Sequence, residues 1–202
     1  MPSRSLKSLS LRSLSAQAAS CTACAKSLPL GARPVFRAGA AARLLIVGQA
    51  PGRRVHESGI PWNDPSGDVL RAWLDLDRER FYDASRIAIV PMGLCYPGSE
   101  NGADLPPRPE CGPRWQARFR AALPRVELVL LVGSYAVNFH VRNRKKKTLT
   151  ETVRAFREYL PEFFVLPHPS WRNKFWIRKN PWFETEVIPE LRLRVGRCLP
   201  TV

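Results

Sequence analysis

The sequence predicts an α/β fold, in the form of a three-layer α/β/α sandwich around a central four-stranded parallel sheet. Four short runs are apolar at nearly every position, as is typical of parallel strands that are covered on both faces. These runs are residues 44–47, 87–90, 128–132 and 163–166. Segments with helical spacing alternate with them, which is typical of a parallel sheet. A chain of 202 residues, 45% of them hydrophobic, has room for one domain with a sizeable core.

Five segments have the spacing of helices, and they are residues 66–76, 113–123, 134–141, 148–160 and 181–195. The first begins at Ser66, and serine is a common N-cap residue. The fourth opens with Thr148-x-x-Glu151, the pattern of a capping box. Segment 96–109 is rich in Pro, Gly and polar residues, so we expect a loop there.

The first 20 residues are rich in Ser, Leu and Arg and contain no acidic residue. Transit peptides for organelles have this composition. Leu6, Leu9 and Leu14 also fall roughly on one side of a helix, and we favour a short amphipathic helix that leads into Cys21. We therefore expect a single domain over residues 1–202, in which residues 1–20 form a lead segment.

The net charge gives the first indication of function. Lys and Arg number 32 against 17 Asp and Glu, which gives a net charge of +15. A chain this basic attracts polyanions, among which we favour nucleic acid over an acidic membrane surface. No run of about 18 apolar residues occurs, so no membrane span is expected. We expect a monomeric, cytoplasmic protein, associated with the nucleoid if its source is prokaryotic.

The residues that directly follow the strands are expected to form the ligand site, because ligands of open α/β sheets bind beyond the carboxyl ends of the strands. Residues 48–52 (GQAPG) follow the first strand, and residues 168–170 (HPS) follow the last. The second strand is followed by residues 91–93 (PMG) and the third by residues 133–134 (GS).

GQAPG and HPS, in this order and each after a strand, resemble the two signature motifs of the uracil-DNA glycosylase superfamily. Residues 59–62 (GIPW) resemble a third segment of that superfamily, GRPF, whose aromatic ring stacks on a flipped uracil. The resemblance covers roughly residues 20–195. It implies a DNA-repair enzyme that flips uracil out of DNA and hydrolyses its N-glycosidic bond, leaving an abasic site. It also implies DNA, single- or double-stranded, as the partner.

Four cysteines, Cys21, Cys24, Cys95 and Cys111, are placed as in the iron–sulfur glycosylases of families 4 and 5. The resemblance implies that they hold a 4Fe-4S cluster. Considered by themselves, four thiolates also suit zinc at the same site. Another interpretation is that no metal binds and the cysteines are plain buried thiols. Cys198 is left over, and we expect it to be inert.

Cleavage of the glycosidic bond builds positive charge on the sugar and negative charge on the departing uracil. By resemblance, His168 donates a hydrogen bond to uracil O2; its other interpretation is a structural histidine. The best-known family has an Asp at the third position of the first motif, where this chain has Ala50. Family 4 has a Glu one position earlier, where this chain has Gln49. The first motif therefore supplies no acid.

Asp64 is the predicted catalytic acid in its place. It stands in a D-x-S-G segment (residues 64–67) similar to the one that carries the catalytic Asp of family 5. There it would orient the attacking water and stabilise the sugar cation. Its other interpretation is an acid at a helix N-terminus, where it interacts with the helix dipole. Asp68 is the reserve candidate.

Trp62 stands where the superfamily has its stacking ring, and core packing is its other interpretation. The superfamily's uracil-reading Asn would fall after the second strand, where this chain has Pro91. We therefore expect backbone groups of Met92 or Gly93 to read the base, and a range of bases beyond uracil. The predicted substrate-binding residues are Gln49, Ala50, Trp62, Met92, Gly93 and Asn173.

Residues 171–173 (WRN) follow HPS, and in the superfamily this loop pushes a residue into the duplex. Arg172 is aligned with that wedge. Residues 142–147 (RNRKKK) are either a solvated turn or a loop that contacts phosphates. His56 is expected to contact an abasic sugar or to face solvent. The predicted DNA-binding residues are Arg53, Arg54, Lys145, Lys146, Lys147, Ser170 and Arg172.

The motifs contain no lysine that would form a Schiff base, so we expect a monofunctional N-glycosyl hydrolase without lyase activity. The alternative is a catalytically weak member of the superfamily that binds uracil or abasic sites in DNA without efficient turnover. Release of the base would distinguish these two hypotheses.

Overall fold

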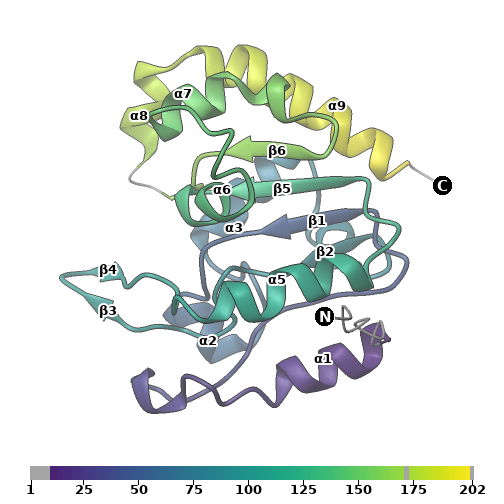
Figure 1. Ribbon diagram of the computed structural model, residues 1–202. Coiled ribbons are helices and arrows are strands. Elements are labelled where there is room, and N and C mark those ends of the chain that lie inside the picture. Colours follow the sequence, from purple (N-terminus) through teal and green to yellow (C-terminus); the bar gives the residue numbers. More distant parts are fainter. Residues whose placement is uncertain (1–9, 171–172, 201–202) are drawn as a thin grey trace, which may run out of the picture.

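The computed structural model describes residues 10–170 and 173–200, which fold around one parallel sheet covered by helices (Figure 1). The sheet has the strand order β2-β1-β5-β6, with every neighbouring pair parallel. Its strands are β1 (Leu44–Val47), β2 (Ile87–Ile89), β5 (Leu128–Val132) and β6 (Phe163–Leu166). The α/β architecture with a four-stranded parallel sheet is thus confirmed, and each strand lies on one of the four apolar runs.

The helices lie on both faces of this sheet, with α5 and α6 in front of it and α3 behind it in Figure 1. α1 packs on α5, and α9 packs on α3. The α-helices are α1 (Leu11–Ala19), α2 (Arg53–Ser58), α3 (Pro65–Leu74), α4 (Arg78–Phe81), α5 (Cys111–Ala122), α6 (Ser134–His140), α7 (Leu149–Arg154), α8 (Lys174–Lys179) and α9 (Ile188–Cys198). Shorter turns are the 3-10 helices η1 (Ala25–Ser27) and η2 (Phe156–Tyr159) and the π-helical η4 (Phe183–Val187).

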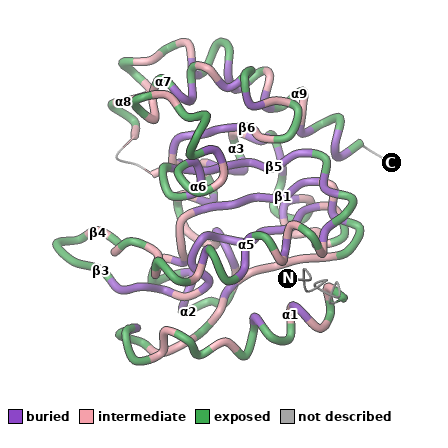
Figure 2. Tube along the Cα trace, in the orientation of Figure 1, coloured by how far each residue is buried: buried purple, intermediate pink, exposed green. Residues whose placement is uncertain are grey.

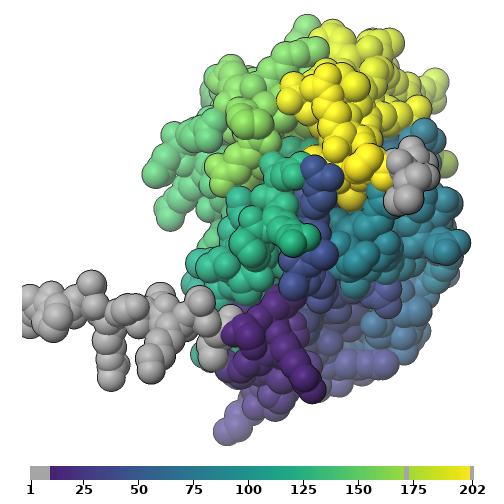
Figure 3. Space-filling view, turned by 90° about the vertical axis from the view of Figure 1, so that its right-hand side faces the viewer, coloured from purple at the N-terminus to yellow at the C-terminus, as the bar shows by residue number. Residues whose placement is uncertain are grey.

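The buried residues concentrate in the four strands and on the inner sides of the helices (Figure 2). All residues of β1, β2 and β5 are buried, since both faces of these strands are covered. The lead segment is helical from Leu11, and Leu14 is almost fully buried in the core. Residues 1–9, which include Leu6 and Leu9 of the predicted helix, lie outside the described residues. Figure 3 shows α1 and the end of α9 on the side of the molecule away from the carboxyl ends of the strands.

Three sequence predictions need correction. The helix expected from Ser66 begins one residue earlier and is capped by Asp64, because the Asp64 side chain accepts a hydrogen bond from the Gly67 amide at 2.8 Å. The helix expected over 148–160 has the predicted capping box but divides into α7 and η2. The last helix, expected over 181–195, is η4 followed by α9.

The predicted loop 96–109 contains a small antiparallel hairpin, formed by β3 (Ser99–Glu100) and β4 (Ala103–Asp104). Asn101 and Gly102 form its turn, both with positive φ. In Figure 1 the hairpin projects from the edge of the molecule toward which β1, β5 and β6 point. No helix among the described residues is long and apolar enough to cross a membrane.

Candidate active site

A cavity of about 460 Å³ lies at the carboxyl ends of β1 and β6. It is the place where an open α/β sheet binds its ligand. Segments that are far apart in the sequence meet there. They are residues 48–52 after β1, residues 61–66 in part, the β3–β4 hairpin, and the segment after β6 with His168, Ser170 and Asn173.

The first motif forms one wall of the cavity. Gly48 is packed so closely against the Trp62 ring that a Cβ on it would lie 2.7 Å from Trp62 Cζ2. Gln49 and Ala50, two of the predicted substrate-binding residues, line the cavity. The Gln49 amide also donates a long hydrogen bond, 3.4 Å, to the carbonyl of Leu105 beyond the hairpin. The motif therefore links the sheet, the tryptophan and the hairpin.

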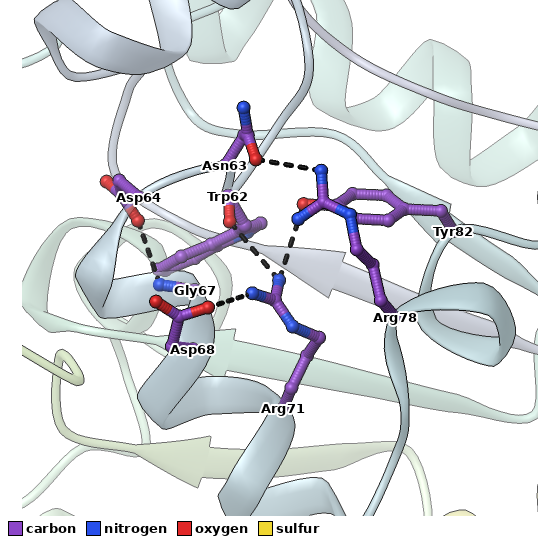
Figure 4. Close-up of polar contacts among 8 residues, drawn as sticks. All are labelled: Trp62, Asn63, Asp64, Gly67, Asp68, Arg71, Arg78 and Tyr82. Atoms are coloured by element: carbon purple, nitrogen blue, oxygen red, sulfur yellow. Dashed lines mark hydrogen bonds and ion pairs between the residues drawn. The ribbon is translucent and has the colours of Figure 1, made fainter.

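Trp62 is held in an uncommon conformation. Its φ is +58°, in the left-handed region that bulky side chains rarely adopt. The Arg71 guanidinium donates to its carbonyl at 3.4 Å, and Asp68 pairs with the same guanidinium (Figure 4). Trp62 is only 9% exposed, and its ring lies 5.6 Å from the His168 ring, centroid to centroid. Trp62 is therefore part of both the core and the cavity wall.

Gly67 permits this conformation, which gives a prediction for stability. A Cβ on Gly67 would lie 1.8 Å from the Trp62 carbonyl oxygen, so Gly67→Ala forces the turn open. We expect it to lower the free energy of unfolding by at least the ~1–3 kcal/mol typical of overpacking. Gly196→Ala in α9, where a Cβ meets nothing within 4 Å, is the matched control and should be neutral or stabilising. Thermal unfolding checks this; an unchanged melting temperature for Gly67→Ala would contradict it.

The location of Asp64 suits both interpretations that the sequence left open, an acid at the ligand site and an acid at a helix N-terminus. Its Oδ1 atom caps α3 by accepting from the Gly67 amide (Figure 4). The residue also lines the cavity. Its Oδ2 atom lies 4.0 Å from the point that a Cβ on Gly52 would occupy. Asp68, the reserve candidate, does not line the cavity, and its 74% exposed side chain is paired with Arg71. Of these two acids, only Asp64 faces the cavity.

His168 lines the same cavity as the first motif. Burial lowers the pKa of its imidazole below the ordinary value, and the nearby Asp64 carboxylate opposes this shift in part. The ring is therefore neutral near pH 7, the state that can donate one N–H without carrying charge. Its backbone carbonyl accepts from the Ser170 amide and from the Asn173 side chain, which fixes the turn after β6.

Met92 and Gly93 lie beside the first motif but do not line the cavity. The Met92 amide donates to the Gly48 carbonyl at 3.0 Å, and the Gly93 amide donates to the Gln49 carbonyl at 2.9 Å. These two N–H groups hold the first motif in place and do not face the cavity. Gln49, Asn173 and the hairpin supply the polar groups that do.

No Lys or Arg of the described residues lines the cavity. Arg53 and Arg54 are exposed at the start of α2, directly after the first motif, and Arg53 pairs with Glu57 at 2.9 Å. Segment 145–147 lies between α6 and α7, where Lys146 pairs with Glu158 at 2.6 Å. Arg172, the predicted wedge, lies outside the described residues.

His56 is buried, which excludes one of the two alternatives predicted for it, that it faces solvent. It is 7% exposed, and its Nδ1 atom has no hydrogen-bond partner among residues 10–170 and 173–200. Burial lowers its pKa, and the nearby Arg33 guanidinium lowers it further. The ring does not line the cavity either, and it lies 5.9 Å from the Tyr96 ring.

The four predicted cysteine ligands line one small cavity of their own, at the N-terminal end of α5. Burial raises the pKa of the Cys24 thiol and of the Cys111 thiol to about 11, and the neighbouring cysteines add to both shifts. Within the described chain, no group of three or more His, Cys, Asp or Glu side chains is arranged to hold a metal ion. Cys198 is buried in α9.

The β3–β4 hairpin is the part of the site that the sequence analysis missed. Gly102, Ala103 and Asp104 all line the cavity. The Asn101-Gly102 pair was the available signal, because Asn-Gly is the commonest pair in tight hairpin turns. The two-residue strands are too short and too exposed to show an alternating pattern.

Comparison with protein families places most of this chain in a known superfamily. Residues 36–192 match the family described as the uracil DNA glycosylase superfamily. The matched span contains both motifs, Asp64, Trp62 and the hairpin. Cys21 and Cys24 lie before it.

Proposed function

Because this chain belongs to the uracil-DNA glycosylase superfamily, we propose that it flips uracil out of DNA and hydrolyses the bond between the base and C1′ of the sugar. The observation that supports this most is the cavity at the carboxyl ends of β1 and β6. It gathers a carboxylate, a buried neutral imidazole and an aromatic wall in one place. These are the groups that the reaction requires.

In the proposed mechanism, His168 and Asp64 act on opposite charges. The bond from C1′ to N1 of uracil breaks, and its electron pair leaves with the base. The His168 N–H stabilises the charge that grows on uracil O2. Asp64 stabilises the sugar cation and accepts a proton from the water whose oxygen bonds to C1′. Since Oδ1 of Asp64 caps α3, Oδ2 is the atom assigned to the water.

The base would lie against the Trp62 ring and the His168 imidazole, which are neighbours in the cavity. We assign reading of the uracil edge to Gln49, because its amide lines the cavity and offers both a donor and an acceptor. Asn173 is at the same cavity and is the second such amide. We therefore assign the reading of the base to these two side chains in place of the Met92 and Gly93 backbone amides, which donate to the first motif.

The basic residues suit DNA with its phosphates on the rim of the cavity. Arg53 and Arg54 stand beside the first motif, and the net charge of the chain is +15. Such contacts supply affinity without sequence preference. We propose that the protein acts as a monomer, with Lys145, Lys147 and Ser170 as further contacts to the DNA backbone.

We propose that Cys21, Cys24, Cys95 and Cys111 hold a 4Fe-4S cluster, since all four line one cavity. In such a cluster each thiolate binds a different iron, so the thiolates stand farther apart than around one zinc ion. This suits thiols that line one cavity together. When bound, the cluster would supply covalent cross-links between the segment that joins α1 to η1, the loop after β2 and the start of α5.

Purified protein should therefore show the broad visible absorption of an iron–sulfur cluster. Cys111→Ser should remove this absorption and lower the melting temperature, because the cross-link is lost. Cys198→Ser, at a buried cysteine in α9, is the matched control and should keep the colour. A colourless protein with one bound zinc would show that the four cysteines hold zinc and not an iron–sulfur cluster. A folded protein without any metal would contradict both assignments.

The test of the proposed function is a panel of oligonucleotides that contain uracil, hypoxanthine or xanthine. Each is incubated with the protein and then treated with alkali, which cleaves DNA at abasic sites. We expect cleavage of the uracil strand, with weaker cleavage of the others. Retained binding without any cleavage would favour the alternative, a member that binds damaged DNA without turnover.

A further inference from the structure

The β3–β4 hairpin brings a second carboxylate to the cavity. The register of the hairpin pairs Asp104 with Ser99, at the end near the body of the protein and away from the turn. The Leu105 amide donates to the Gly98 carbonyl at 2.9 Å and closes this end. The Leu105 carbonyl also accepts from the Gln49 side chain of the first motif. Asp104 is therefore attached to the cavity wall, although its side chain is exposed.

The chain after the hairpin is packed against the first motif as well. A Cβ on Gly93 would lie 2.9 Å from Cβ of Pro107 and 3.2 Å from Cβ of Ala50. Three segments are thus in contact at this place: the first motif, the residues after β2, and the return of the hairpin. This contact fixes where Asp104 lies relative to residues 48–52.

Asp104 and Asp64 face the same small space beside Gly52. The point that a Cβ on Gly52 would occupy is 3.1 Å from Oδ2 of Asp104 and 4.0 Å from Oδ2 of Asp64. The two oxygens are separated by no more than the sum of these distances. Gly52 has φ −75°, which any residue adopts, so its backbone does not require a glycine. The absence of a side chain instead leaves space between the carboxylates.

We propose that Asp104 is a second catalytic carboxylate, and that it holds the attacking water together with Asp64 in the space beside Gly52. This inference rests on the proposed function. A water molecule has two protons, and each carboxylate accepts a hydrogen bond from one of them. The lone pairs of the water oxygen then point away from both acids, toward the sugar. One acid alone leaves the water free to turn.

The step is the same hydrolysis, with one more participant. The water oxygen bonds to C1′ while the bond from C1′ to N1 breaks, and the electron pair leaves with uracil. One water proton passes to Asp64. The other stays on the new C1′ hydroxyl, which donates a hydrogen bond to Asp104. The charge of Asp104 adds to that of Asp64 in stabilising the sugar cation.

Asp104→Asn tests this role, with Glu100→Gln as the matched control. Both changes remove one negative charge from the hairpin, but Glu100 is exposed and does not line the cavity. Single-turnover release of uracil and binding to DNA with a stable abasic analogue are measured for both. We expect Asp104→Asn to slow release about tenfold or more and to bind DNA as tightly as the wild type or more tightly. Glu100→Gln should release uracil at the wild-type rate.

Gly52→Ala provides an independent test, because it places a methyl group where the water is expected. The backbone tolerates alanine there, so the melting temperature should stay within a few degrees of the wild type while release of uracil slows. If Asp104→Asn releases uracil at the wild-type rate, this inference is overturned and the proposed function stands. If the wild-type protein releases no uracil, the proposed function fails and takes this inference with it.

Discussion

Asp64→Asn is expected to slow uracil release by about 10²–10⁴-fold, the range that general acid–base groups contribute. The asparagine keeps an oxygen that accepts from the Gly67 amide, so the cap of α3 is preserved. What is lost is the negative charge beside the sugar and the acceptor for the proton of the water. Single-turnover release of uracil measures the effect, and binding to DNA with an abasic analogue should be unchanged or tighter.

The control for Asp64→Asn is Asp75→Asn, at the other end of α3. Asp75 is exposed and caps the helix with a positive φ that asparagine also adopts readily. The Asp75→Asn variant should release uracil at the wild-type rate. Asp68→Asn compares the reserve candidate directly, and we expect it to retain far more activity than Asp64→Asn because Asp68 does not line the cavity. The reverse order would transfer the catalytic role to Asp68.

His168→Ala is expected to slow uracil release by about 10²–10³-fold, the usual loss when one donor to a developing anion is removed. Because burial lowers the pKa of this imidazole, the active neutral form persists as pH falls through 6.5. Wild-type activity should therefore decline only at pH values below that ordinary pKa. Rates of release across a pH series check this expectation.

His168→Gln distinguishes a donor from a packing role. The glutamine amide keeps an N–H donor but lacks the imidazole ring that lies against Trp62. If His168 acts as a donor to the base, His168→Gln should recover part of the rate lost in His168→Ala. Equal rates for the two variants, together with equal losses of thermal stability, would assign His168 to packing alone.

The sheet was predictable because its strands are buried on both faces. Nearly every residue of β1, β2, β5 and β6 is apolar, so the runs are visible without knowledge of their partners. The ends of the helices were harder to predict. At the start of α3, Ser66 and Asp64 are both good N-cap residues, and only the hydrogen bond from the Gly67 amide decides between them. Where a segment changes from α to 3-10 or π geometry depends on contacts made after folding.

The site was predictable where its residues directly follow a strand or stand in a motif. Gln49, Asp64, Trp62 and His168 all meet at one cavity. Asp104 was not predictable, because the path of the hairpin and its contact with the first motif bring it there. The direction of a backbone N–H is equally hidden in a sequence. The Met92 and Gly93 amides turn toward the first motif, and only the tertiary structure shows this.

The most direct test of the central claim is the appearance of free uracil. Wild-type protein in excess is mixed with DNA that carries one uracil, and the released base is measured by chromatography with mass detection. The account predicts one free uracil for each strand and an intact sugar–phosphate backbone before alkali treatment. Binding of the DNA with no free uracil would contradict it.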